Sequence, residues 1–193
     1  ETWEIFSNCL YLVRHAFNLR IHSFVLMSNH FHMLVTTPDG NLSEAMNYFL
    51  RETSKEISRR QKRSNHNFRQ KYFRSLIKDD RHHSVVYKYI YQNPVRAGIC
   101  EKAHQYKYST LRQVIGLDKC IIAINDDILF NGKDDWADIF HWVNDSATTE
   151  ETESIQKGLK KNEFKLVINR KIRRPSTINY SQIDAPATPF GSG

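Results

Sequence analysis

The stretch that decides the fold is residues 24–35, which read FVLMSNHFHMLV. Two apolar runs flank Ser28 and Asn29, a polar pair suited to a tight turn, so we predict a β-hairpin. Successive side chains of a strand point to opposite faces. The second strand, residues 30–36, therefore places His30 and His32 on one face, while Phe31 points the other way and anchors the strand in a core.

The paired histidines His30 and His32 suggest a metal site. Two imidazoles on one face of a strand can bind a single divalent cation. Two surface histidines on a half-buried strand would give the same pattern, and the pair alone favours that simpler interpretation. The choice between them depends on the rest of the chain.

A second informative stretch is residues 87–98, YKYIYQNPVRAG, which reads as the end of a helix. Asp79 or Asp80 can cap the start of this helix, and apolar residues recur at helical spacing towards Asn93. Pro94 disfavours helical geometry in the residue before it, so we expect the helix to end near Asn93.

Tyr89 and Asn93 are four residues apart in this helix and share a face, whereas Tyr87 and Tyr91 point elsewhere. A phenol one turn from an amide oxygen suits a nucleophile placed beside a third metal ligand. The alternative is a buried tyrosine on an amphipathic helix that ends in an asparagine. Together with the two histidines, the arrangement favours a reactive site.

These motifs together resemble a known family. Residues 27–35, MSNHFHMLV, are similar to the metal strand of the HUH single-strand endonucleases, and more narrowly of the REP-associated tyrosine transposases. Residues 89–98 are similar to the nucleophile helix of that family and the turn after it. Residues 38–43 and 68–72 also fit the pattern, in the right order. The resemblance extends over about residues 3–117.

The resemblance implies a ferredoxin-like α+β domain that cuts and rejoins single-stranded DNA through a phosphotyrosine. Tyr89 would be the nucleophile, because a phenolate is also a good leaving group when the reaction reverses. His30, His32 and the side-chain oxygen of Asn93 would hold a divalent cation. Mg²⁺ or Mn²⁺ suits such ligands in octahedral geometry, although imidazoles favour softer ions.

The order of the elements predicts an antiparallel sheet with helices packed on one face. We expect helices at residues 3–17, 42–57 and 80–93, strands at 21–27 and 30–36, a strand within 68–77, and a short helix at 106–115.

The chain departs from the family pattern at its start. The first strand of the family normally precedes the opening helix and pairs with the metal strand, whereas Glu1 already lies within that helix. Either a leading segment is omitted or another strand takes this place. Residues 164–168 are the obvious later candidate.

The composition is consistent with this interpretation. The chain has 193 residues and a formal net charge of +7, which favours a polyanionic partner. Its three cysteines show no paired spacing, so we expect reduced thiols in a cytoplasmic protein. No apolar run approaches the length that spans a membrane, and no signal peptide is recognisable.

A basic interval at residues 51–74 is interleaved with aromatic residues, a composition typical of single-strand DNA binding. A solvated helix end with core aromatics is the alternative for about half of these residues. Arg96 either touches the scissile phosphate or braces the turn. The predicted DNA contacts are Arg59, Arg60, Arg63, Arg69, Lys71, Arg74 and Arg96, and the expected partner is a DNA hairpin with a single-stranded flank.

We divide the chain into a transposase-like domain at residues 1–117, an acidic helical extension at 118–160, and a basic, partly disordered tail at 161–193. The family resemblance favours a monomer over a dimer. A non-catalytic binder of structured single-stranded DNA or RNA is the alternative function, since ferredoxin-like sheets are common binding platforms. The presence of both histidines with the tyrosine and asparagine favours the nuclease.

Overall fold

The computed structural model describes residues 1–61, 72–119, 121–122, 124, 136–145 and 147–166. Strands β1 (Arg20–Leu26) and β2 (Phe31–Thr36) pair antiparallel and form the predicted hairpin. The hairpin closes at Ser28 and Asn29, where the Met27 amide donates to the His30 carbonyl over 2.8 Å. His32 lies opposite Val25 in this register, so the histidine pair is at the hairpin end of the sheet.

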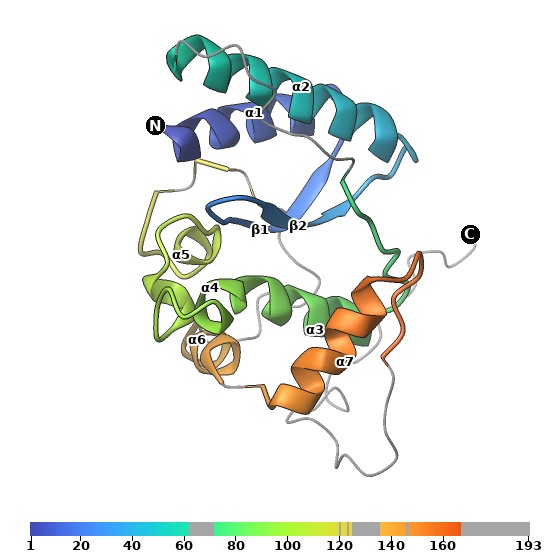
Figure 1. Cartoon of the computed structure of the whole chain (residues 1–193), viewed down its shortest axis with the longest axis vertical. Coiled ribbons are helices and arrows are strands. Elements are labelled where there is room, and N and C mark those ends of the chain that lie inside the picture. Colours follow the sequence, from blue (N-terminus) through green and yellow to red (C-terminus); the bar gives the residue numbers. More distant parts are fainter. Residues whose placement is uncertain (62–71, 120, 123, 125–135, 146, 167–193) are drawn as a thin grey trace, which may run out of the picture.

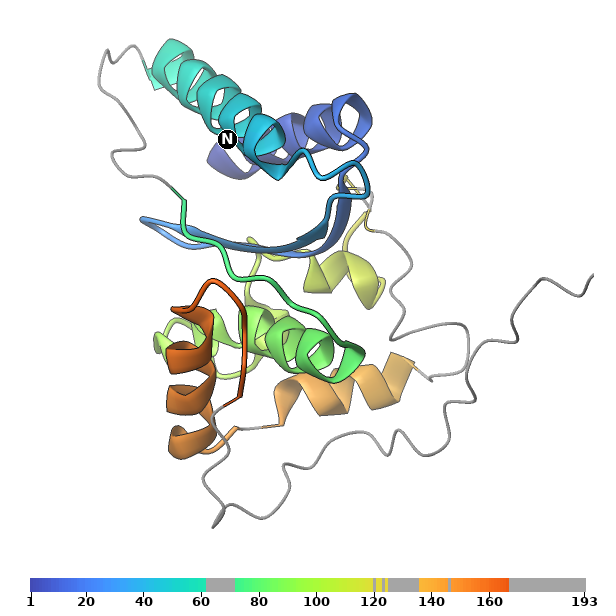
Figure 2. The same cartoon turned by 90° about the vertical axis from the view of Figure 1, so that its right-hand side faces the viewer.

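Helices cover both faces of the strand pair (Figures 1 and 2). Helices α1 (Thr2–Ala16) and α2 (Leu42–Gln61) pack on one face, and α3 (Asp80–Tyr91) packs on the other. The α+β class is confirmed, but the expectation of helices on one face alone is wrong. The reason lies in β1, where every residue from Ile21 to Leu26 is buried, so that both of its faces need a cover.

The two faces of the sheet belong to two separate hydrophobic clusters. Phe24 packs with α1 and α2, whereas Val25 and Leu34 pack against α3. Burial on both faces is typical of a strand in the middle layer of three, and in β1 even the polar residues His22 and Ser23 are buried. The strand pair is therefore the middle layer of the molecule (Figure 2).

The outer edge of β1 is paired with residues 108–110. The Leu26 amide donates to the Tyr108 carbonyl over 2.9 Å, and the Thr110 amide donates to the Phe24 carbonyl over 3.0 Å. The helix predicted at residues 106–115 is therefore wrong in its first half, because that backbone pairs with β1. Helix α5 spans only Leu111–Val114, and a 3₁₀ turn precedes the pairing at Ala103–Gln105.

The strand predicted within residues 68–77 does not form in its described part, residues 72–77. Leu76 makes a single parallel bridge with Glu163, supported by a hydrogen bond from its amide to the Asn162 carbonyl. Residues 163–166 therefore lie beside Leu76 rather than in the sheet, and Val167 and Ile168 lie outside the described residues. Apolar residues suggested the strand, but Leu76 is 58% exposed here.

The predicted helical extension is present as α6 (Trp136–Asn144) and α7 (Thr149–Leu159). Both helices contribute to the hydrophobic cluster of α3, through Trp142 and Ile155 respectively. Helix α3 is thus enclosed by the sheet on one side and by the extension on the other (Figure 1). In the described part of the chain, no helix has the length and apolar character needed to cross a membrane.

Candidate active site

Helix α3 begins and ends where its sequence predicts. Of the two possible caps, Asp79 is the one that caps, since its carboxylate accepts from the His82 amide over 2.8 Å. The helix ends at Tyr91, and Gln92 separates it from the four-residue helix α4 (Asn93–Arg96). Pro94 stands in the first turn of α4, where its missing amide proton costs no helical hydrogen bond.

Three tyrosines of α3 point in different directions. Tyr87 and Tyr91 are fully buried, and the Tyr91 hydroxyl is 2.9 Å from the Thr110 hydroxyl. Tyr89 is 7% exposed and lines a cavity. The prediction that Tyr87 and Tyr91 point away from the site is therefore confirmed, and Tyr89 is the phenol that faces the cavity.

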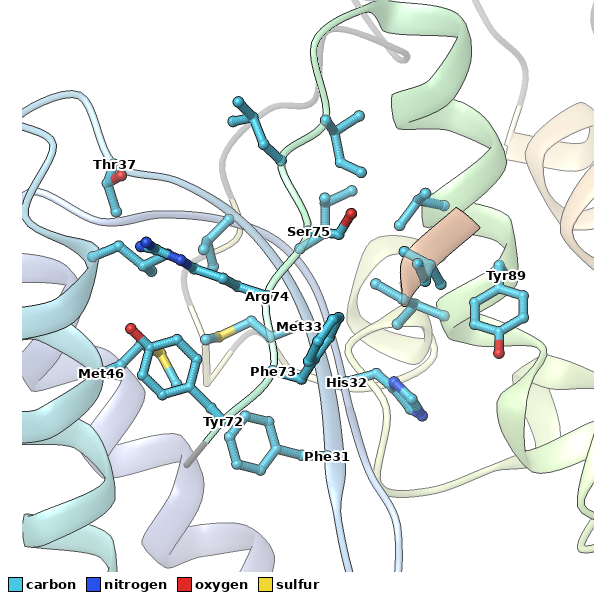
Figure 3. A pocket seen from close by; sticks show the side chains of 18 of the residues that line it. Phe31, His32, Met33, Thr37, Met46, Tyr72, Phe73, Arg74, Ser75 and Tyr89 are labelled. Atoms are coloured by element: carbon cyan, nitrogen blue, oxygen red, sulfur yellow. The ribbon is translucent and has the colours of Figure 1, made fainter. Parts of the chain in front are cut away.

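The cavity has a volume of about 1570 Å³ and lies along β2, between residues 72–77, α2 and α3. Figure 3 shows His32 and Tyr89 on the α3 side of β2, with Phe31 on the opposite side. This is the predicted alternation of the strand. His30, His32 and Tyr89 line the same cavity, so the structure brings together the residues of two motifs that are far apart in sequence.

The two imidazoles converge on one point. The Nε2 atoms of His30 and His32 are 3.1 Å apart, and their rings are perpendicular. The other nitrogen of His30, Nδ1, is 2.6 Å from the side-chain oxygen of Asn29, which fixes the tautomer that leaves Nε2 as an acceptor. Asn29 was predicted only as a turn residue; its place next to His30 was the sequence signal for this orienting role.

The donor set fits a divalent cation. With bonds of about 2.1 Å, two ligands at right angles on an octahedral ion lie about 3.0 Å apart, close to the observed separation of the nitrogens. Burial, helped by the positive charges of His30 and Arg96, lowers the pKa of His32 to about 4. The imidazole is therefore neutral at neutral pH, which is the form that binds a metal.

A third metal ligand beside the two imidazoles, taken from the part of the chain that the structure describes, would have to be something other than a His, Cys, Asp or Glu side chain. Among the described residues, no group of three or more His, Cys, Asp and Glu side chains is placed to hold a metal. Asn93 is the first residue of α4, and its amide nitrogen donates to the carbonyls of Tyr89 and Ile90 in the last turn of α3, each over 3.1 Å. These bonds leave its side-chain oxygen available. Its role as a ligand stays a prediction.

Arg96 folds back from α4 onto the candidate nucleophile. Its guanidinium carbon lies 3.8 Å from the centre of the Tyr89 ring, and Nη2 donates to the Tyr89 carbonyl over 2.9 Å. Burial lowers the pKa of Arg96, and the contact with Tyr89 opposes this change. The guanidinium remains charged at neutral pH.

The structure places the other predicted DNA contacts in different regions. Arg74 lines the cavity and is exposed. Arg59 and Arg60 both pair with Glu56, and the hydrogen bonds from these two arginines lower the pKa of that carboxyl to about 2. They lie at the end of α2, on the face of the sheet opposite α3. Arg63, Arg69 and Lys71 lie outside the described residues.

Two comparisons with known proteins found matches to this chain. The model of a family described as "Transposase IS200 like" matches residues 3–93. The chain is also similar to a solved structure described as "Structure of the REP associates tyrosine transposase bound to a REP hairpin". That match has a TM-score of 0.52 and 20% sequence identity, and it covers 63% of this chain and 73% of the other. Among curated proteins, none matches this sequence.

The residues matched by the family model include the hairpin, both histidines, α2, α3 and Asn93. It confirms the resemblance that these motifs predict. Residues 3–93 are thus similar to the transposases of the IS200-like family, and this similarity supports a transposase-like role in DNA processing.

Proposed function

We propose that this protein is a metal-dependent single-strand DNA endonuclease and strand-transferase. The observation that carries the proposal is the shared cavity, in which the Tyr89 phenol faces two imidazoles whose Nε2 atoms are 3.1 Å apart. His30, His32 and the Asn93 oxygen would hold Mg²⁺ or Mn²⁺, and such an ion polarises a non-bridging phosphate oxygen when bound. A site used only for binding DNA would have no need of this donor pair.

In this proposal Tyr89 attacks the phosphorus of a phosphodiester. The phenol oxygen forms a bond to phosphorus while the bond from phosphorus to the 3′ oxygen breaks. The phenol proton is released, and the departing 3′ oxygen takes up a proton. The 5′ end is then held as a phosphotyrosine diester, which keeps the energy of the bond, so a 3′ hydroxyl can reverse the step and rejoin the strand.

We propose a DNA hairpin with a single-stranded flank as the substrate. The similar structure is described as bound to a REP hairpin, and the net charge of +7 suits a polyanion. Beside the cavity, Phe73 is 67% exposed and Arg74 is also exposed, so that a base can stack on the ring while a phosphate meets the guanidinium. A regular duplex would not offer unpaired bases to this surface.

The test is formation of a covalent adduct with DNA. The full chain is incubated with Mn²⁺ or Mg²⁺ and a pool of labelled hairpins of randomised stem and flank, and the adduct is detected after denaturation. Tyr89→Phe should abolish the adduct, a loss of several orders of magnitude in rate, because it removes one oxygen and leaves the packing unchanged. Tyr91→Phe is the matched control, since that hydroxyl bonds Thr110 away from the cavity.

The outcomes separate the two candidate functions. An adduct that needs both Tyr89 and a divalent cation supports the nuclease. An adduct that survives Tyr89→Phe but disappears in Tyr91→Phe would show that the nucleophile is wrongly assigned. Tight hairpin binding without an adduct under any condition would identify a non-catalytic binder instead.

A further inference from the structure

Arg96 makes an unusual return contact with the residue proposed as the nucleophile. It follows Tyr89 by seven residues, and one guanidinium both covers the phenol ring and donates to the carbonyl of the same residue. The ring of Tyr89 therefore contacts Arg96 of α4 in addition to the hydrophobic cluster around α3. Figure 3 shows the free end of this phenol on the same side of β2 as His32.

Capping of the helix does not explain this contact. The carbonyls at the end of a helix need donors, but the Asn93 amide already donates to the Tyr89 carbonyl. A half-buried guanidinium loses hydration, and Nη1 of Arg96 is buried with no hydrogen-bond partner among the described residues. A neutral side chain would fill this space without that loss, so the charge at this position calls for another explanation.

We propose that Arg96 is a positioning residue for cleavage, which holds the plane of the Tyr89 phenol and keeps a positive charge against its ring. This inference rests on the proposed function. As the phenol proton leaves, and before the bond to phosphorus is complete, negative charge on the oxygen is shared with the ring, and the attraction of the ring for the guanidinium increases. The cation is already in place before this charge develops, so the step needs little reorganisation around the phenol.

Two other roles for Arg96 predict different measurable effects. As a phosphate contact it would contribute to DNA affinity and to the salt dependence of binding. As a brace for the turn after α3 it would contribute to stability alone. A positioning residue instead changes the rate of adduct formation at saturating DNA and leaves affinity and melting temperature nearly unchanged.

The experiment compares Arg96→Met and Arg96→Lys in the full chain. Methionine keeps the length and the apolar packing but removes the charge, whereas lysine keeps the charge but cannot stack as a plane. Arg112→Met is the matched control, because Arg112 pairs with Asp118 and donates to the His104 carbonyl away from the cavity. Each variant is measured for melting temperature, hairpin affinity at two salt concentrations, and the rate of adduct formation at saturating hairpin.

Arg96→Met should slow adduct formation by about 100-fold, the loss expected when a reacting group is misplaced by about 1 Å. Arg96→Lys should recover part of this rate, and affinity should stay within about twofold of the parent in both variants. In protein labelled with 3-fluorotyrosine, the Tyr89 resonance, identified by its loss in Tyr89→Phe, should shift in Arg96→Met and stay unchanged in Arg112→Met.

An unchanged adduct rate in Arg96→Met would overturn the inference while the proposed function stands. A loss of affinity with a smaller salt slope would assign Arg96 to the phosphate instead, and a large drop in melting temperature that explains the lost rate would make it a brace. If the parent protein forms no adduct at all, the proposed function fails first and the inference fails with it.

Discussion

Gln92 connects the end of α3 to the C-terminal extension, and its removal should destabilise the protein. The side chain is 7% exposed, and its amide nitrogen donates to the carbonyls of Val143, over 3.1 Å, and Asp145, over 2.5 Å. These carbonyls belong to the end of α6, which has no helical donors for them. Gln92 is thus a hydrogen-bonded link between α3 and α6.

The magnitude follows from these two bonds. Each is worth about 1 kcal/mol net, and a buried carbonyl left without a donor costs about 1–3 kcal/mol more, so Gln92→Ala should lower the free energy of unfolding by about 2–4 kcal/mol. For a chain of this length, about 2–4 °C is lost per kcal/mol, so the melting temperature should fall by roughly 4–16 °C. Gln92→Glu should cost at least as much, because a carboxylate would face two carbonyl oxygens.

The assay is thermal unfolding followed by circular dichroism, with Gln113→Ala as the control. Gln113 accepts one long hydrogen bond, 3.4 Å from the Ile122 amide, so its loss should cost well under 1 kcal/mol. If Gln92→Ala melts within 2 °C of the control, roughly the experimental margin for such a difference, the proposed link between α3 and the extension is refuted.

Three further predictions concern the site. Phe31→Ala should lower the free energy of unfolding by about 2–4 kcal/mol, because the Phe31 ring packs against the rings of Phe6, Phe24 and Phe49. His32→Ala should lower it by about 1 kcal/mol or less. If His32→Ala lowers the melting temperature more than Phe31→Ala does, the two faces of β2 have been assigned the wrong way round. Asn29→Ala should weaken Mn²⁺ binding by about 10–100-fold in calorimetry without changing stability, and unchanged affinity would show that it does not orient its neighbour. Arg74→Ala should reduce the slope of log affinity for the hairpin against log salt concentration by about one, because Arg74 lines the cavity. Arg59→Ala should leave this slope unchanged, because Arg59 is already paired with Glu56. Equal effects of the two substitutions would contradict the proposal that DNA binds along the cavity.

The features that the sequence predicts correctly are local ones. The two-residue turn at Ser28 and Asn29, the alternation of His32 with its neighbours, and the end of α3 before Pro94 each depend on a few adjacent residues. The direction of Tyr89 also follows from helical spacing, because a residue two positions away in a helix points to a different side. Such patterns hold wherever the chain is folded against a core.

The features that were missed depend on residues far apart in the chain. Pairing of β1 with residues 108–110 replaces the predicted helix there, because a free strand edge gives these amides and carbonyls partners that a helix would otherwise supply. The charge pattern of the sequence predicts a DNA surface at the basic end of α2. In the structure Arg60 also pairs with Glu4 of α1, fifty-six residues away, a contact that charge spacing within α2 does not predict.

The five residues that follow Tyr91 form the joint on which the site depends. Gln92 donates hydrogen bonds to the extension, and the Asn93 amide donates to the last turn of α3. Pro94 stands in the first turn of α4, and Arg96 contacts the ring of Tyr89. The side chains of these residues point in different directions because the helix is interrupted at Gln92. The side chains of α4 therefore do not lie on the continuation of any face of α3. An unbroken helix would carry Arg96 away from the phenol, since a residue seven positions later lies about 10 Å further along the axis. The proline is therefore needed for the geometry of the site as well as for the end of the helix.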